Sequence, residues 1–200
     1  QVLPTPYTFE KARLVIREMT DDLVLSMVEK RLNADQMVLS VGYDISNLAK
    51  NSSNATKYQG EVKQDYYGRA VPKHAHGSIN LKERTSSTKI ILEAVTELFE
   101  RIVAPELLVR RMYVVANHVL HEENAPDPNE YRQLSLFEDP EKVEEEDEKH
   151  RSELEKERKI QEAMLSIKHR YGKNAVIKGM NLEEGATAME RNRQVGGHKA

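Results

Sequence analysis

The sequence predicts an α+β fold of the split βαβ type, βαββαβ, with a four-stranded sheet and two helices on one of its faces. Apolar residues recur every three or four positions over residues 8–32 and 86–102, which predicts two amphipathic helices. Apolar residues alternate with small or polar ones over 37–43, 77–82 and 109–120, which predicts three strands. With a short strand at the start, these segments follow the order of a split βαβ domain.

The ends of the first strand and of the first helix are marked by residues that stop or cap such elements. Gln1-Val2-Leu3 is the shortest predicted strand, and Pro4 and Pro6 close it. Thr8 can cap the first helix, which is predicted to end near Leu32-Asn33. Its apolar side consists of Ala12, Val15, Ile16, Met19, Leu23, Met27 and Val28. The next strand, Met37 to Tyr43, has one apolar face and one small or polar face.

The second half of the domain begins with a long segment that has no regular pattern of apolar residues. Residues 45–73 show no periodicity and are predicted to form a long loop or an irregular hairpin, a length that is often functional. A strand follows from Gly77 to Lys82. Ser86 or Ser87 then caps the second helix, and Pro105 stops it. The strongest strand, Val109 to Leu120, places Met112, Val114 and Ala116 on one face and Arg111, Tyr113, Val115 and Asn117 on the other.

The sheet face that the helices leave uncovered is predicted to be polar or cationic. Its side chains include Ser40, Gly42, Ser78, Asn80, Lys82, Arg111 and Asn117. Such a set can contact phosphates through cations, hydroxyls and backbone N–H groups, with little readout of sequence. A solvated outer face explains any one of these residues equally well, so only the whole set indicates nucleic acid.

Composition limits the possible functions. The chain has 200 residues, 38% of them hydrophobic, and no cysteine, which allows one modest core and excludes disulfides and cysteine-based sites. No apolar run reaches membrane-spanning length. Residues 1–132 carry 17 basic and 18 acidic side chains, residues 133–158 carry 5 and 11, and residues 159–200 carry 8 and 4. Residues 45–89 alone hold 8 basic and 3 acidic side chains, enough for one basic surface.

A short peptide motif follows the predicted domain. It consists of Gln133, Leu134, Ser135, Leu136 and Phe137. Pro126 and Pro128 precede it and Pro140 follows it, so its apolar residues have little local core to join. Such a segment suits a preformed pocket on another protein, although a docking strand of the same domain is an alternative. The pattern resembles the motif that binds the bacterial sliding clamp.

Together, the split βαβ order, the strand Arg110-Arg111-Met112-Tyr113-Val114 and the downstream Gln-Leu-Ser-Leu-Phe resemble the C-terminal part of a Y-family translesion DNA polymerase. The similarity is to the UmuC/DinB-like repair polymerases of Gram-positive bacteria. It covers nearly the whole chain, since Tyr171 to Asn174 and Gly196 to Ala200 are similar to the tail of that subgroup.

The resemblance implies an error-prone polymerase region that acts in DNA repair, damage tolerance and the SOS response, in the bacterial cytoplasm at the nucleoid. In that family the little-finger domain holds primer-template DNA across the major groove with its sheet, and the clamp motif tethers the enzyme to the replication fork. The expected DNA contacts are Ser78, Asn80, Lys82, Arg110 and Arg111. The expected sliding-clamp contacts are Gln133, Leu134, Ser135, Leu136 and Phe137.

No catalytic residue, cofactor or metal site is predicted within this chain. The parent polymerase is expected to use Mg²⁺ held by acidic residues of a palm domain that would precede Gln1. Asp21-Asp22 lies within a predicted helix and Asp127 between prolines, so neither suits that role. His74 and His76 can lie on one side of a strand, but a third ligand is missing nearby. The chain is therefore expected to bind DNA without polymerising it.

Four segments are expected: a little-finger DNA-binding domain over 1–123, a linker with the clamp motif over 124–140, a charged helix over 141–171 and a mobile tail over 172–200. Residues 141–171 alternate Glu with Lys and Arg and have almost no helix breakers, which favours an exposed helix with i,i+4 ion pairs over a disordered tail. Its narrow apolar stripe, which can dock on other repair proteins, is Ile160, Met164, Ile167 and Tyr171.

Two other functions fit the same pattern. An RNA-binding sheet of this topology would need stacking aromatics, and Tyr113 is the lone candidate on the predicted open face. A protein-interaction adaptor would bind the clamp but show no affinity for DNA at low salt. Neither the lesion specificity of the parent nor the oligomeric state follows from the sequence.

Overall fold

The computed structural model describes residues 1–49, 58–125, 140–195 and 198–199. Its longer elements, in chain order, are β1 (Val2–Tyr7), α1 (Phe9–Glu29), β2 (Leu32–Tyr43), β5 (Ala75–Thr85), α2 (Thr88–Ile102), β6 (Val109–Asn117) and α3 (Pro140–Tyr171). The shorter ones are η1 (Ile45–Leu48), β3 (Val62–Gln64), β4 (Ala70–Pro72), β7 (Leu120–His121), η2 (Glu122–Asn124), η3 (Gly179–Leu182), α4 (Ala188–Arg191), β8 (Gln194–Val195) and β9 (His198–Lys199). The order of the long elements confirms the predicted α+β class.

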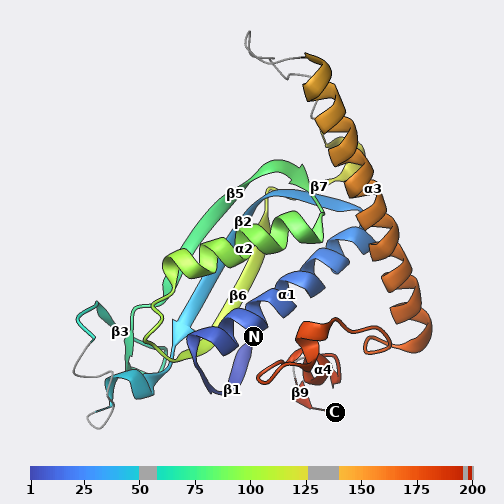
Figure 1. Cartoon of the computed structure of the whole chain (residues 1–200). Coiled ribbons are helices and arrows are strands. Elements are labelled where there is room, and N and C mark those ends of the chain that lie inside the picture. Colours follow the sequence, from blue (N-terminus) through green and yellow to red (C-terminus); the bar gives the residue numbers. More distant parts are fainter. Residues whose placement is uncertain (50–57, 126–139, 196–197, 200) are drawn as a thin grey trace.

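The sheet has the strand order β1-β6-β2-β5, and every neighbouring pair is antiparallel. Strands β1 and β2 are therefore parallel to each other with β6 between them, and β5 and β6 are parallel with β2 between them. Each crossover helix thus skips one strand, which is the split βαβ arrangement. Figure 1 shows α1 and α2 side by side on the same face of the sheet.

The core lies between that helix pair and the inward face of the sheet. The central strand β2 contributes Met37, Leu39 and Val41, which are fully buried, in the alternating pattern that the sequence predicts. Helix α2 approaches β5 closely at Gly77, where a Cβ atom would lie 3.2 Å from both Leu98 Cδ1 and Ile102 Cγ2. A larger residue at that position would push α2 away from the sheet.

Several element boundaries differ from the sequence prediction, and a left-handed residue marks two of them. Strand β1 runs to Tyr7, so Pro4 and Pro6 lie within it and do not close it, because an edge strand tolerates residues without an N–H. Helix α1 ends at Glu29, and Arg31 has φ 53°, so β2 begins at Leu32, earlier than the predicted Met37. The predicted strand 109–120 is interrupted at His118, which has φ 50° and separates β6 from β7. Both turns depend on backbone conformations that alternation of apolar residues does not reveal.

The turn after β2 is held by one buried amide. Asn47, in η1, donates from Nδ2 to the carbonyls of Asp44 and Leu108, each at 2.9 Å. Its Oδ1 accepts from the Leu108 backbone N–H at 2.9 Å. This side chain therefore joins the end of β2 to the start of β6, next to the residues that the sequence analysis assigns to DNA.

Replacing Asn47 by alanine should lower the free energy of unfolding by about 2 kcal/mol, because the Leu108 backbone N–H loses its acceptor and the Asp44 and Leu108 carbonyls each lose one of their donors. Urea denaturation measures the change. The adjacent Ser46→Ala is the matched control, since the buried Ser46 hydroxyl has no hydrogen-bond partner among the described residues. Its removal should be neutral or slightly stabilising, and equal losses in both variants would contradict this account.

Helix α3 crosses the end of the sheet at which α2 begins (Figure 1). Glu157 accepts hydrogen bonds from Ser87 Oγ at 2.6 Å and from the Lys89 backbone N–H at 3.0 Å. Gln161 Nε2 donates to Thr88 Oγ1 at 2.9 Å. Glu157 of α3 therefore satisfies one free N–H group, that of Lys89, in the first turn of α2, where a negative charge is favoured.

The residues after α3 return to α1. Asn181, Thr187 and Ala188 all donate to the buried Glu18 carboxylate, at 2.7 to 3.2 Å. Arg191 pairs with Asp22 nearby. The sequence analysis expects residues 172–200 to be mobile, whereas the described part of this segment contacts α1 through hydrogen bonds and ion pairs. The four-segment division stays a prediction.

Candidate nucleic-acid interface

The uncovered face of the sheet carries ordered rows of polar side chains. In one row Gln36 donates to Asn80 Oδ1 at 2.8 Å and accepts from Asn117 Nδ2 at 3.0 Å, so three amides link β5, β2 and β6. In another row, Ser40 Oγ lies 2.6 Å from His76 Nδ1. These cross-strand bonds fix the side chains in place. The face is therefore preorganised for contact with a polar ligand.

Three of the five predicted DNA contacts are on β5. Ser78, Asn80 and Lys82 are all exposed and alternate with inward residues, so they lie along one line on the open face. Ser78 is opposite Val38, which is opposite Val115 on β6. The middle of the face is therefore partly apolar, and its polar groups gather toward the ends.

The other two predicted contacts meet at a β-bulge. The pairing shifts between Gly42 with Arg111 and Tyr43 with Val109, so β6 has one extra residue, Arg110, at this point. Arg110 and Arg111 line the same groove of about 670 Å³. Regular alternation would direct consecutive side chains to opposite faces. The bulge thus brings together two cations that strand periodicity separates.

The hairpin of β3 and β4 forms the opposite wall of that groove, which we call the basic groove. Lys63, Arg69 and His74 line it together with the two arginines of β6. The sequence analysis allows an irregular hairpin here but assigns these three residues no role. The signal that could have found them is the excess of basic residues over positions 45–89. Figure 1 shows the hairpin at the end of the sheet opposite α3.

Acidic residues in this region are already paired. Asp44 Oδ2 lies 3.8 Å from Arg110 Nε. Asp65 accepts from Arg69, and this hydrogen bond holds the pKa of the Asp65 carboxyl below its usual value. Lys63 Nζ also lies 3.8 Å from Glu61 Oε1, whereas Arg111 has no ion pair among the described residues. The basic groove therefore keeps the Arg111 guanidinium available for an anionic ligand.

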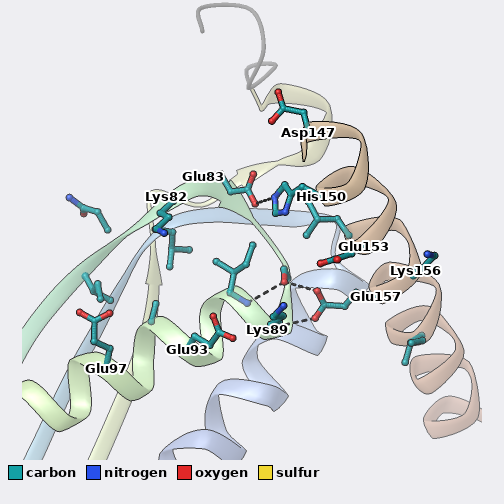
Figure 2. Close-up of a pocket in the computed structure, with 18 residues that line it drawn as sticks. Lys82, Glu83, Lys89, Glu93, Glu97, Asp147, His150, Glu153, Lys156 and Glu157 are labelled. Atoms are coloured by element: carbon teal, nitrogen blue, oxygen red, sulfur yellow. Dashed lines mark hydrogen bonds and ion pairs between the residues drawn. The ribbon is translucent and has the colours of Figure 1, made fainter. Parts of the chain in front are cut away.

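A second groove, of about 1060 Å³, lies between α2, β5 and α3. Asn80 and Lys82 border it, Arg110 and Arg111 line the basic groove, and Ser78 lines neither cavity. Figure 2 shows acidic side chains spread over its walls and the hydrogen bond between His150 and Glu83. Its acidic lining residues are Glu83, Glu93, Glu97, Asp147, Glu153 and Glu157, against the cations Lys82, Lys89 and Lys156. Such a lining does not suit phosphates.

Other predicted features can be placed briefly. The clamp-motif residues, Gln133 to Phe137, lie outside the described residues. His74 and His76 have ring centroids 6.4 Å apart. Within the described ranges, no cluster of three or more His, Asp or Glu residues could hold a metal, so they offer no ligand set for the Mg²⁺ expected of the parent polymerase. None of the described helices is long and apolar enough to cross a membrane.

Comparison with known families identifies the family of this chain. The model of the impB/mucB/samB family C-terminal domain matches residues 1–136. The chain belongs to this family. The impB/mucB/samB C-terminal domain is the C-terminal part of UmuC/DinB-type Y-family polymerases, which are translesion enzymes of DNA repair, so the resemblance is confirmed. The match extends from β1 into the clamp motif and ends at Leu136. No curated protein and no solved structure matches the chain.

Proposed function

We propose that this impB/mucB/samB C-terminal domain holds primer-template DNA on the open face of its sheet and recruits a bacterial sliding clamp through residues 133–137. The observation that carries the DNA part is the basic groove, where the bulge presents Arg110 and Arg111 beside an uncovered polar sheet. Phosphate oxygens are the ligands that such exposed guanidinium groups bind best. Contacts of this kind fix the position of a duplex without reading its sequence.

Replacing Arg111 by glutamine should weaken binding to primer-template DNA several-fold and equally for unrelated sequences. Because each phosphate contact releases condensed counterions, the slope of log affinity against log salt should fall by about 0.9. Fluorescence anisotropy titrations at several salt concentrations measure both quantities. The slope matters more than the affinity, since it counts the ionic contacts that are lost.

The matched control is Arg13→Gln, which removes the same charge from α1 on the other side of the sheet. Arg13 pairs with Glu10 and Glu100 there, at 2.9 and 2.7 Å. This variant should change affinity little and leave the salt slope intact. If both arginine variants behave alike, net charge rather than the open face accounts for DNA binding. If the native chain does not bind DNA at low salt, the adaptor reading replaces the proposal.

The clamp part rests on the sequence of the motif and on the family. Leu136 and Phe137 supply two apolar anchors, and Gln133 supplies an amide for hydrogen bonds at the edge of a pocket. In the sequence, residues 133–137 come after η2 and before α3, and the described strands of the sheet all lie in other segments of the chain. A clamp and DNA can therefore be bound by different parts of the same chain.

A further inference from the structure

The tip of the β3–β4 hairpin exposes two adjacent aromatic rings. Tyr66 and Tyr67 are 96% and 75% exposed. Tyrosine rings normally bury much of their area, so a largely exposed pair on a polar domain indicates a surface that a ligand covers. On the open face itself Tyr113, which is 49% exposed, is the lone candidate for stacking, and the Tyr66 and Tyr67 pair lies beside that face.

The turn at the tip of the hairpin is stabilised by hydrogen bonds and by a glycine. The Asp65 carboxylate accepts from the backbone N–H groups of Tyr67 and Arg69, each at 2.9 Å. Gly68 has φ 75°, the left-handed conformation that closes a three-residue hairpin loop. The two tyrosine rings meet edge to face with centroids 5.3 Å apart, and Arg69 Cζ lies 5.1 Å from the Tyr67 centroid. The rings are therefore held in a defined arrangement before any ligand arrives.

The tip is also continuous with the cationic surface. Tyr66 lines the basic groove together with Lys63, Arg69, Arg110 and Arg111. A cationic channel with aromatic rings at its edge is the combination by which proteins bind single-stranded nucleic acid, because the cations follow the backbone and the rings stack on bases. Bases within a duplex are already stacked and paired, so they do not offer a free face to these rings.

We propose that Tyr66 and Tyr67 form a stacking platform for unpaired bases of single-stranded DNA that extends from the duplex on the open face. This inference rests on the proposed DNA-binding function and adds a preference for the junction between duplex and single strand. The basic groove binds the phosphates of the extension, and the tyrosine rings contact its bases. The preference is independent of base sequence, since every base has a π-face.

The test compares the whole 200-residue chain with its Tyr66→Ala/Tyr67→Ala variant. The probes are a short blunt duplex and the same duplex with a single-stranded extension, both labelled for anisotropy. The native chain should bind the extended probe about tenfold more tightly than the blunt one, the effect expected of one or two stacked bases. The alanine variant should lose this preference and bind the two probes with similar affinity.

The matched control is Tyr66→Phe/Tyr67→Phe, which keeps the rings and should keep the preference. A 2-aminopurine base in the extension supplies a second readout, since stacking on a ring quenches its fluorescence. An equal loss of affinity for both probes, or no preference in the native chain, would overturn the inference without overturning the proposed DNA-binding function. Absence of binding to every probe would instead remove the proposed DNA function. Reduced affinity for the clamp alone would assign the tip to a protein interface.

Discussion

Replacing Leu136 and Phe137 together by alanine should abolish saturable binding to a bacterial sliding clamp. Burial of each side chain in a pocket contributes about 1.5 to 3 kcal/mol before the cost of ordering the segment. Loss of both anchors therefore amounts to at least about a hundredfold in affinity, which exceeds what the rest of a short motif retains. Calorimetric titration of the clamp with native and variant chains measures the difference.

The same variant separates the two proposed activities. Its affinity for primer-template DNA should be unchanged, whereas Arg111→Gln should lose DNA affinity and keep its clamp affinity. Binding of the clamp by both the native chain and the double variant would remove the motif from the mechanism. So would the absence of clamp binding by either chain, and the ligand of the domain would then have to be sought on the sheet.

The fold could be predicted because apolar residues recur regularly, every three or four positions in the helices and every second position in the strands. Met37, Leu39 and Val41 alternate with polar residues, and each is fully buried in the structure. The predicted cap at Ser87 is present, since its hydroxyl accepts from the Ile90 backbone N–H at 3.3 Å. Turns at Arg31 and His118 could not be predicted in this way, because positive φ values at those residues depend on tertiary contacts.

The candidate site could be predicted only in part. Exposed residues on β5 follow from alternation, so Ser78 and Asn80 lie where the sequence places them. The position of Arg110 does not follow from alternation, because only the bulge in β6 brings this residue beside Arg111. The hairpin carrying Lys63 and Tyr66 has strands of three residues, too short for a periodic signal. The sequence shows only an excess of basic residues there, and such an excess does not indicate where each side chain lies.

The contact between the C-terminal segment and α1 also could not be predicted from the sequence. Glu18 lies between Arg17 and Met19 in α1, and a carboxylate in a helix ordinarily marks an exposed position. In the structure it is 1% exposed, and residues more than 160 positions away donate to it. Neither periodicity nor composition indicates a contact between residues so far apart in the sequence. The buried charge is stable only because these donors surround it.

Glu18→Ala should therefore lower the free energy of unfolding by about 3 kcal/mol. The variant leaves the Thr187 and Ala188 backbone N–H groups and the Asn181 amide without their acceptor in a buried site. It should also loosen the segment from η3 to α4, which is held to α1 largely through this carboxylate. Urea denaturation measures the first effect, and limited proteolysis of the C-terminal segment measures the second.

The control on the same helix is Glu10→Ala, which removes an exposed carboxylate that pairs with Arg13 at 2.9 Å. Its cost should stay below about 1 kcal/mol, as for other surface ion pairs. Glu18→Gln keeps one acceptor oxygen and should lose about half as much stability as the alanine variant. If Glu18→Ala unfolds like Glu10→Ala and its C-terminal segment resists protease as in the native chain, the segment is held by other contacts. The expected order, with alanine at position 18 the least stable, would instead identify α1 as the surface that holds the C-terminal segment in place.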